Sequence, residues 1–150
     1  MPRFQSSRTV RFTPRQMFDL VADVESYPHF LPLCEDLRIR RKVVSPEGLD
    51  VLVADMSVGY KAIHETFTSR VTLDPDQLEI RVSYLEGPFS HLDNLWQFLP
   101  DEHGCKVVFF IDYEFRSRML GVLMGSMFDK AFRKFSEAFE ARAALVYAAS

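Results

Sequence analysis

The fold is decided by residues 105–147, which read CKVVFFIDYEFRSRMLGVLMGSMFDKAFRKFSEAFEARAALVY. Residues 105–115 place an apolar side chain at every second position, as in a strand with one buried face. From residue 118 to residue 147 the apolar positions instead recur at helical spacing. One side of this predicted helix, in an arc roughly 140° wide, gathers Leu120, Met124, Phe128, Ala131, Phe132, Phe135, Ala138 and Phe139. The strand and the helix each have one apolar face, so we expect the helix to cover the sheet.

The residues before this segment predict the rest of the sheet. Residues 3–12 resemble a first strand, and Thr13, Pro14 and Gln16 have the residue types of a helix N-terminus with a capping box. From residue 37 onward, turn-forming residues separate β-prone segments at intervals of about 10–14 residues. This spacing predicts an antiparallel meander with one covered face. The chain therefore has the pattern of an α+β fold, with a curved antiparallel sheet of about seven strands wrapped around a long C-terminal helix.

Length and composition favour one small soluble domain spanning residues 1–150. A chain of this length buries roughly 68–70% of its unfolded surface and needs no disulfide to fold. Cys34 and Cys105 lack CxxC spacing, so we expect reduced structural thiols. The longest apolar segment, residues 119–124, is far shorter than the roughly 20 residues of a membrane-spanning helix. No signal peptide is recognisable, which predicts a cytoplasmic protein that is at most peripheral to the inner membrane.

The sequence predicts no catalytic or metal site. Its four histidines have no metal-ligand spacing, and GxSxG, P-loop and GxGxxG motifs do not occur. His64 and Glu65 are neighbours on a predicted strand and therefore point to opposite faces. We expect a binding protein that is not an enzyme, without catalytic residues, metal ligands or a cofactor.

Three apolar segments stand out in regions that are expected to be loops or helix ends. They are residues 27–34, 87–89 and 119–124. Large apolar side chains in such places require cover. One interpretation is that they cap the core of the domain. The other is that they form the mouth of a lipid pocket and contact a bilayer during loading.

The predicted ligand-binding residues come from these segments and from the apolar faces of the strands and the long helix. They are Tyr27, Phe30, Leu31, Pro32, Phe89, Trp96, Phe109, Tyr113, Leu120, Met124, Phe128 and Phe132. Trp96 and Tyr113 each combine a large ring with a hydrogen-bond donor, which suits them to orient a ligand oxygen. Arg70 and His64 are further, ambiguous candidates for the inward face. Gly121 and Gly125 are expected to let the helix approach the sheet closely.

A local basic cluster contains Arg38, Arg40 and Lys42, which alternation places on one face of a predicted strand. Such a cluster is either solvated or contacts anionic groups, which would be lipid headgroups or ribosomal RNA. The net charge of −3 counts against a broad phosphate-binding surface, and no DNA partner is expected.

Several separated motifs resemble the coenzyme Q-binding START-like family of the polyketide-cyclase-like helix-grip superfamily. They are Tyr27-Pro-x-Phe-Leu-Pro-x-Cys34, Gly87-Pro-Phe89 ahead of Leu92 and Trp96-x-Phe98, Phe115-x-Ser117, and Ala138-Phe-x-x-Arg-Ala143 followed by Tyr147. The resemblance implies a helix-grip fold that holds ubiquinone or a related polyprenyl lipid as a bound ligand between sheet and helix. It implies a quinone chaperone or carrier that supports respiratory electron transport, and the apolar segments described above would give such a carrier a transient contact with the membrane.

The same family includes bacterial ribosome association toxins (RatA). The alternative function that the resemblance implies is therefore binding to the large ribosomal subunit, which blocks subunit joining. An enzyme of the superfamily, a cyclase or hydratase, is a third alternative. No catalytic residues are implied by the family resemblance.

Overall fold

The computed structural model describes residues 3–148, and within this range the chain forms seven strands, two α-helices and one 3₁₀-helix. In chain order these are β1 (Arg3–Val10), α1 (Pro14–Ala22), η1 (Val24–His29), β2 (Cys34–Val44), β3 (Asp50–Tyr60), β4 (Ile63–Asp74), β5 (Glu79–Glu86), β6 (Phe89–Asp101), β7 (Gly104–Phe115) and α2 (Arg118–Val146). This order confirms the predicted succession of strand, short helical segments, six strands and long helix.

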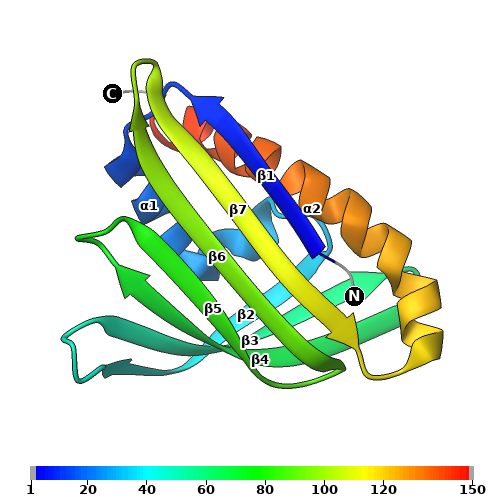
Figure 1. Cartoon of the computed structure of the whole chain (residues 1–150). Helices are drawn as coiled ribbons and strands as arrows, with labels where there is room; N and C mark the ends of the chain where they lie inside the picture. Colours follow the sequence, from blue (N-terminus) through cyan, green and yellow to red (C-terminus); the bar gives the residue numbers. More distant parts are fainter. Residues whose placement is uncertain (1–2, 149–150) are drawn as a thin grey trace.

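The strands form a single antiparallel sheet in the order β1-β7-β6-β5-β4-β3-β2 (Figure 1). Strands β2 to β7 follow one another as a meander, and β1 pairs with β7 to complete the other end. The sheet is strongly curved, so one face is concave. The predicted curved antiparallel sheet is confirmed.

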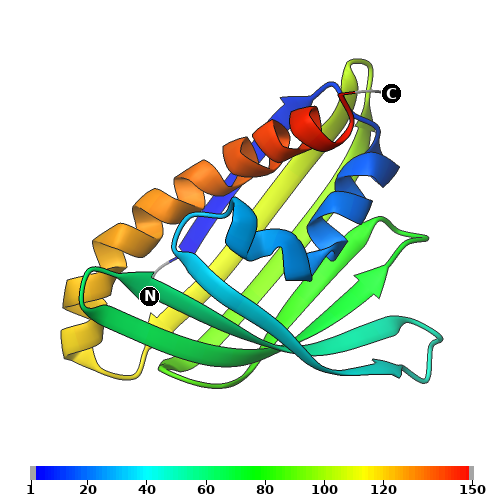
Figure 2. The same ribbon diagram turned by 180° about the vertical axis from the view of Figure 1, so that it is seen from behind.

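All three helical segments lie on the concave side of the sheet (Figure 2). Helix α2 runs along β1 and β7, while α1 and η1 connect the two edge strands across the same side. The hydroxyl of Tyr147 donates a hydrogen bond of 2.9 Å to the carbonyl of Gln16, which ties the end of α2 to α1. The helices and the sheet thus enclose a shared interior.

Local sequence signals explain where both α-helices begin. The Thr13 hydroxyl accepts from the Gln16 amide at 3.0 Å, and the Gln16 side chain accepts from the Thr13 amide at 2.9 Å. These two bonds form the predicted capping box. At α2 the Ser117 hydroxyl accepts from the amide of Leu120 at 3.2 Å. Each cap satisfies a backbone donor that the first helical turn leaves free.

The interior is apolar and rich in aromatic rings. Phe89, Phe98, Phe109 and Phe139 are among the largest fully buried side chains. Cys34 and Cys105 are both buried free thiols, and burial raises the pKa of each to about 11. Among residues 3–148, no helix combines the length and apolar character that crossing a membrane requires.

Candidate ligand-binding site

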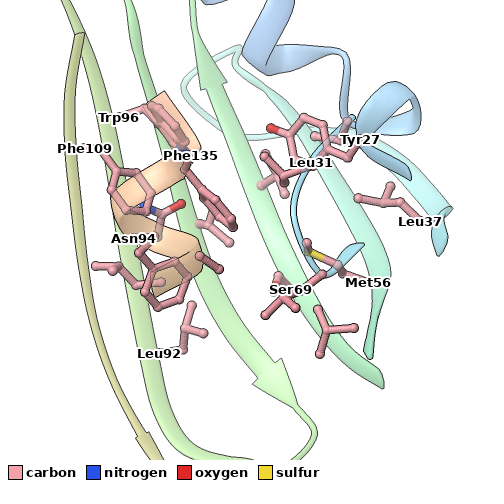
Figure 3. Close-up of a pocket in the computed structure, with 18 of the residues that line it drawn as sticks. Tyr27, Leu31, Leu37, Met56, Ser69, Leu92, Asn94, Trp96, Phe109 and Phe135 are labelled. Atoms are coloured by element: carbon pink, nitrogen blue, oxygen red, sulfur yellow. The ribbon is translucent and has the colours of Figure 1, made fainter. Parts of the chain in front are cut away.

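A cavity lies between the concave face of the sheet and α2 (Figure 3). Its wall comes from η1 and the loop that follows it, from β2 to β7, and from α2. The space open to water-sized molecules is about 110 Å³, and the empty space counted with its opening to solvent is about 940 Å³. The cavity therefore occupies the place where a helix-grip fold would enclose a ligand.

Aromatic side chains from α2 and the sheet form one wall of the cavity. Phe128, Phe132, Phe135 and Phe139 are spaced so that they share one face of α2. They meet Trp96 of β6 and Phe109 of β7, whose ring centroids are 4.6 Å apart. Phe109 also lies 6.0 Å from Phe132 and 5.8 Å from Phe135 between ring centroids. The rings meet tilted or edge to face, at 47° to 90° between their planes, and together form an aromatic wall.

The opposite wall comes from η1 and the loop before β2, where Tyr27, Leu31 and Pro32 face the cavity. The Tyr27 hydroxyl donates a hydrogen bond of 2.5 Å to the carbonyl of Val21, which holds η1 against α1. Burial raises the pKa of Tyr27 far above its ordinary value, so the phenol stays protonated and keeps this bond. Leu33 has a positive φ of 68°, and its carbonyl accepts from the amide of Gly59 at 3.0 Å. These contacts anchor the loop to β3.

Two polar side chains interrupt the apolar lining. Ser69 of β4 and Asn94 of β6 are 5% and 7% exposed and face the cavity from the sheet. The Asn94 side-chain nitrogen donates to the backbone carbonyl of Phe110 at 2.7 Å. Neither residue was among the predicted site residues. A sequence signal existed, since each is a polar residue at an inward position between apolar ones, as in Leu92-x-Asn94-x-Trp96.

The structure brings seven of the twelve predicted ligand-binding residues to the cavity wall. They are Tyr27, Leu31, Pro32, Trp96, Phe109, Phe128 and Phe132. The remaining five, which lie outside the wall, are Phe30, Phe89, Tyr113, Leu120 and Met124. Alternation and helical spacing identify inward faces, but they do not show how far along the core the cavity extends.

Phe89 illustrates why these five residues differ from the prediction. Its ring stacks on Phe115 at 4.8 Å and meets Phe67 edge to face at 5.4 Å, so it fills the core instead of lining a space. Gly87 makes this packing possible, because its φ is 143° and an added Cβ would lie 2.6 Å from the Cβ of Phe67. Tyr113 is also buried beside the cavity, and burial raises the pKa of its phenol to about 12.

Of the three apolar segments considered as a mouth, only residues 119–124 leave large apolar side chains exposed. Leu31 and Phe89 are buried, and Phe30 packs against Phe139 with ring centroids 5.2 Å apart. These loops cap the core. At the start of α2, in contrast, Met119 and Val122 are 70% and 76% exposed, and Leu123 is also exposed.

The expectation for Gly121 and Gly125 was wrong. Apart from the chain neighbours and the nearby backbone of the helix itself, no atom lies within 4 Å of a Cβ added at either position. Both glycines therefore lie on an open side of α2. They share the open first third of the helix with its exposed apolar residues.

A β-bulge changes the predicted arrangement of the basic cluster. Ile39 pairs with Ala54 while Arg41 pairs with Val53, so Arg40 is the extra residue. Lys42 then lies opposite the buried Leu52, on the other face from Arg38, and the prediction that Arg38, Arg40 and Lys42 share a face was wrong. All of these basic residues are exposed, and Arg40 lies 3.7 Å from Asp55.

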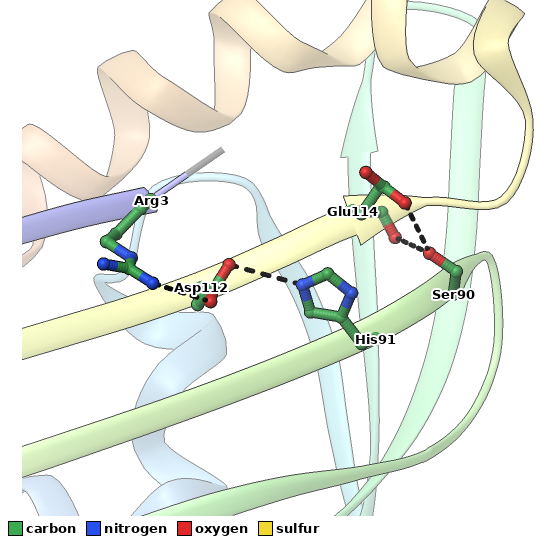
Figure 4. A network of polar contacts seen from close by, with 5 residues as sticks. All are labelled: Arg3, Ser90, His91, Asp112 and Glu114. Atoms are coloured by element: carbon green, nitrogen blue, oxygen red, sulfur yellow. Dashed lines mark hydrogen bonds and ion pairs between the residues drawn. The ribbon is translucent and has the colours of Figure 1, made fainter. Parts of the chain in front are cut away.

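Titratable side chains gather on the outer face of the sheet. Asp112 lies between His91 and Arg3, at 3.3 Å and 3.5 Å, and Ser90 is hydrogen-bonded to Glu114 beside them (Figure 4). The hydrogen bond from His91, with its charge and that of Arg3, lowers the pKa of Asp112. His64 and Arg70 are likewise exposed, so their suggested inward position was wrong. Within residues 3–148, no cluster of three or more His, Cys, Asp or Glu side chains is arranged to hold a metal ion.

Two named proteins are similar to this chain over nearly its whole length. A ribosome association toxin RatA from Rickettsia prowazekii is 36% identical over 95% of this chain and 97% of its own length. A mitochondrial coenzyme Q-binding protein, COQ10 homolog B from Xenopus laevis, is 31% identical over 96% of this chain but only 59% of its own length.

Solved structures agree with the fold. The 18 kDa protein CC1736 from Caulobacter crescentus superposes with a TM-score of 0.81, at 34% identity and 99% coverage of both chains. A START superfamily protein from Mycobacterium smegmatis has a TM-score of 0.78 at 16% identity, with 96% of this chain and 98% of that chain covered. A family model described as polyketide cyclase / dehydrase and lipid transport matches residues 10–140. The chain has a START-like fold and belongs to this polyketide cyclase, dehydrase and lipid transport family.

Proposed function

We propose that this protein binds ubiquinone or a related polyprenyl lipid between its sheet and α2, and carries or chaperones that lipid in support of respiratory electron transport. The observation that carries the proposal is the cavity, whose wall is apolar and aromatic except for Ser69 and Asn94. Sites of this kind hold apolar ligands and use a few polar groups to orient them. The similarity to a coenzyme Q-binding protein over nearly the whole chain supports a quinone as the ligand.

Ligand uptake requires the cavity to expand. The 110 Å³ open to water-sized molecules is smaller than typical small-molecule sites of roughly 300–1,000 Å³. Beyond this enclosed space, the cavity opens to solvent. We therefore propose that the ring enters the closed part, that the tail occupies the opening, and that side chains of α2 rearrange around them.

The proposed role is binding without catalysis, and no cofactor is required for it. Among residues 3–148, the side-chain polar groups of the cavity-lining residues are a serine hydroxyl, an asparagine amide, the indole N–H of Trp96 and a tyrosine hydroxyl already bonded to Val21. The Asp112–His91 pair lies on the outer face instead. Such a lining orients a ligand but provides no acid–base pair that faces it.

A carrier must exchange its lipid with a membrane, and the start of α2 provides a suitable surface. Met119, Val122 and Leu123 expose apolar side chains there, next to the exposed Arg116 and Arg118. Apolar side chains beside cationic ones bind the interface of anionic bilayers. We propose a transient peripheral contact at this surface.

The proposal is tested by filling the cavity. Ala131 is buried on α2 and lines the cavity, so Ala131→Phe should occupy ligand space at an overpacking cost of about 1–3 kcal/mol. The matched control is Ala144→Phe, at an exposed position of the same helix. Binding of added ubiquinone is followed by quenching of Trp96, the single tryptophan, which lies in the wall. Weakening by at least about tenfold in Ala131→Phe alone supports the proposal, and equal binding in both folded variants contradicts it.

Ribosome binding is the second candidate function, and it is favoured by the similarity to ribosome association toxins along nearly the full chain. Exposed Arg38, Arg40 and Arg41 on β2 would contact ribosomal RNA. Binding to purified large subunits should then weaken steeply between 50 and 200 mM salt. It should also fall when Arg40 and Arg41 are replaced by Gln, while Lys61→Gln serves as a control at another exposed position. Binding that changes neither with salt nor with the arginine substitutions would exclude this surface as the contact with the ribosome.

A further inference from the structure

Ser69 is a polar group that the fold leaves unpaired inside the cavity. Its side chain is buried in β4 and lines the cavity. Within residues 3–148, its hydroxyl oxygen has no hydrogen-bond partner. Buried polar atoms are nearly always paired, so an unpaired one at a cavity wall points to a ligand atom. A serine hydroxyl can either donate or accept that bond.

Asn94 provides a second polar group whose direction is fixed. Its side-chain nitrogen donates to the carbonyl of Phe110 at 2.7 Å. A backbone carbonyl only accepts hydrogen bonds, so the NH₂ end of the amide must face Phe110. The amide oxygen then points into the cavity, toward the space between Trp96 and Phe135 (Figure 3). The cavity therefore presents a fixed acceptor at this position.

We infer that the cavity selects the reduced, hydroquinone form of its quinone ligand, an inference that rests on the function proposed above. A quinone has carbonyl oxygens, which only accept, and a carbonyl facing the Asn94 oxygen leaves both buried oxygens unpaired. A hydroquinone has hydroxyl groups, and one of them donates to Asn94. Ser69 serves either form, because its hydroxyl donates to a carbonyl and pairs with a hydroxyl equally well.

The positions of the two groups suit a ring with oxygen atoms on opposite sides. Ser69 lies on β4 and Asn94 on β6, with β5 between them. Two interstrand spacings separate their strands by roughly 10 Å, and both side chains reach inward from there. Trp96, next to Asn94 on the inward face of β6, offers a ring surface against which a quinol ring can pack.

The test compares both redox forms of a short-tail ubiquinone analogue. Dissociation constants are measured by anaerobic calorimetry for the wild type, Asn94→Leu and Ser69→Ala. The wild type should bind the hydroquinone at least about tenfold tighter, as expected for one buried hydrogen bond. Asn94→Leu should remove this preference by weakening hydroquinone binding alone. Ser69→Ala should weaken both forms and keep the ratio.

Two further readouts use the wild type and do not depend on the folding of a variant. The dimethyl ether of the hydroquinone has no donor and should bind no tighter than the quinone. A tenfold preference should also raise the midpoint potential of the bound couple by about 30 mV, since it is a two-electron couple. Equal binding of both forms, or tighter quinone binding, overturns the inference while leaving lipid binding intact. Failure of either form to bind overturns the proposed function and this inference together.

Discussion

Trp96 and Phe139 pack edge to face with ring centroids 5.1 Å apart, and this contact joins β6 to α2 across the cavity wall. Phe139 is fully buried and also meets Tyr27 at 5.3 Å and Phe30 at 5.2 Å between ring centroids. One helical side chain therefore holds the sheet and the η1 loop together. The position of α2, and with it the shape of the cavity, depends on this ring.

Replacement of Phe139 by Ala should lower the free energy of unfolding by about 3–5 kcal/mol, because it removes a fully buried ring and leaves a cavity. Urea unfolding followed by Trp96 fluorescence measures the loss. Leu145→Ala, at a 70% exposed position of the same helix, should change stability by less than about 0.5 kcal/mol. Similar effects of the two substitutions would show that Phe139 does not anchor α2.

Replacement of Gly121 by Ala should raise the free energy of unfolding by about 0.5–1 kcal/mol, because alanine is the better helix former and the added methyl group meets open space. The contrasting variant is Gly87→Ala, which should destabilise the protein through its positive φ and the contact with Phe67. Thermal or urea unfolding measures both. A loss of stability in Gly121→Ala would mean that this side of α2 is packed against something after all.

The outer-face network predicts a pH dependence of stability. The pKa of Asp112 is lowered below its ordinary value of 3.8, mainly by the hydrogen bond from His91 and further by Arg3. A lowered folded-state pKa stabilises the protein above the unfolded pKa, and this contribution is lost as pH falls through the folded pKa. The stability difference between the wild type and Asp112→Asn should therefore be constant from about pH 6 to pH 5 and shrink below pH 3.8.

Urea unfolding at a series of pH values from 6 to 2 measures that difference, with Asp76→Asn in an exposed turn as the control. The control should follow the wild type across the series. Asp112→Asn and wild-type curves that stay parallel down to pH 2 would show that the network contributes nothing to acid stability.

The exposed start of α2 predicts a surface for lipid exchange. Replacement of Val122 and Leu123 by Ser should slow quinone transfer between anionic vesicles by at least about tenfold, because both side chains would otherwise bury apolar area in the bilayer interface. Stability should hardly change, since both are exposed. The matched control replaces Leu145 and Val146, exposed at the other end of α2, by Ser. Equal transfer rates in the two double variants would place the membrane contact elsewhere.

Periodicity and turn chemistry were sufficient to predict the fold. The alternation in β7, the helical spacing in α2 and the capping box at Thr13 are all local signals, since each lies within a short stretch of consecutive residues. The inward faces of β6, β7 and α2 followed from the same patterns, and Trp96, Phe109, Phe128 and Phe132 on these faces lie at the cavity wall.

Features that depend on three-dimensional packing were not predictable in this way. The bulge at Arg40 shifts Lys42 to the other face, and no local signal marks it. Phe89 and Met124 share inward faces with cavity residues, yet they are packed solidly and line no space. The proposed ligand contacts of Asn94 and Ser69 could not be predicted, because they depend on β4 and β6 lining the same cavity. The orientation of the Asn94 amide depends in addition on its hydrogen bond to Phe110.

The most direct test of lipid binding is native mass spectrometry, combined with organic extraction, of protein purified from a quinone-producing host. The account predicts a co-purifying polyprenyl quinone at substantial stoichiometry in the wild type and in Ala144→Phe, and its loss from Ala131→Phe, whose added ring fills the cavity. Wild-type protein that is empty, and that also fails to take up added quinone, would contradict the account and favour ribosome binding as the function.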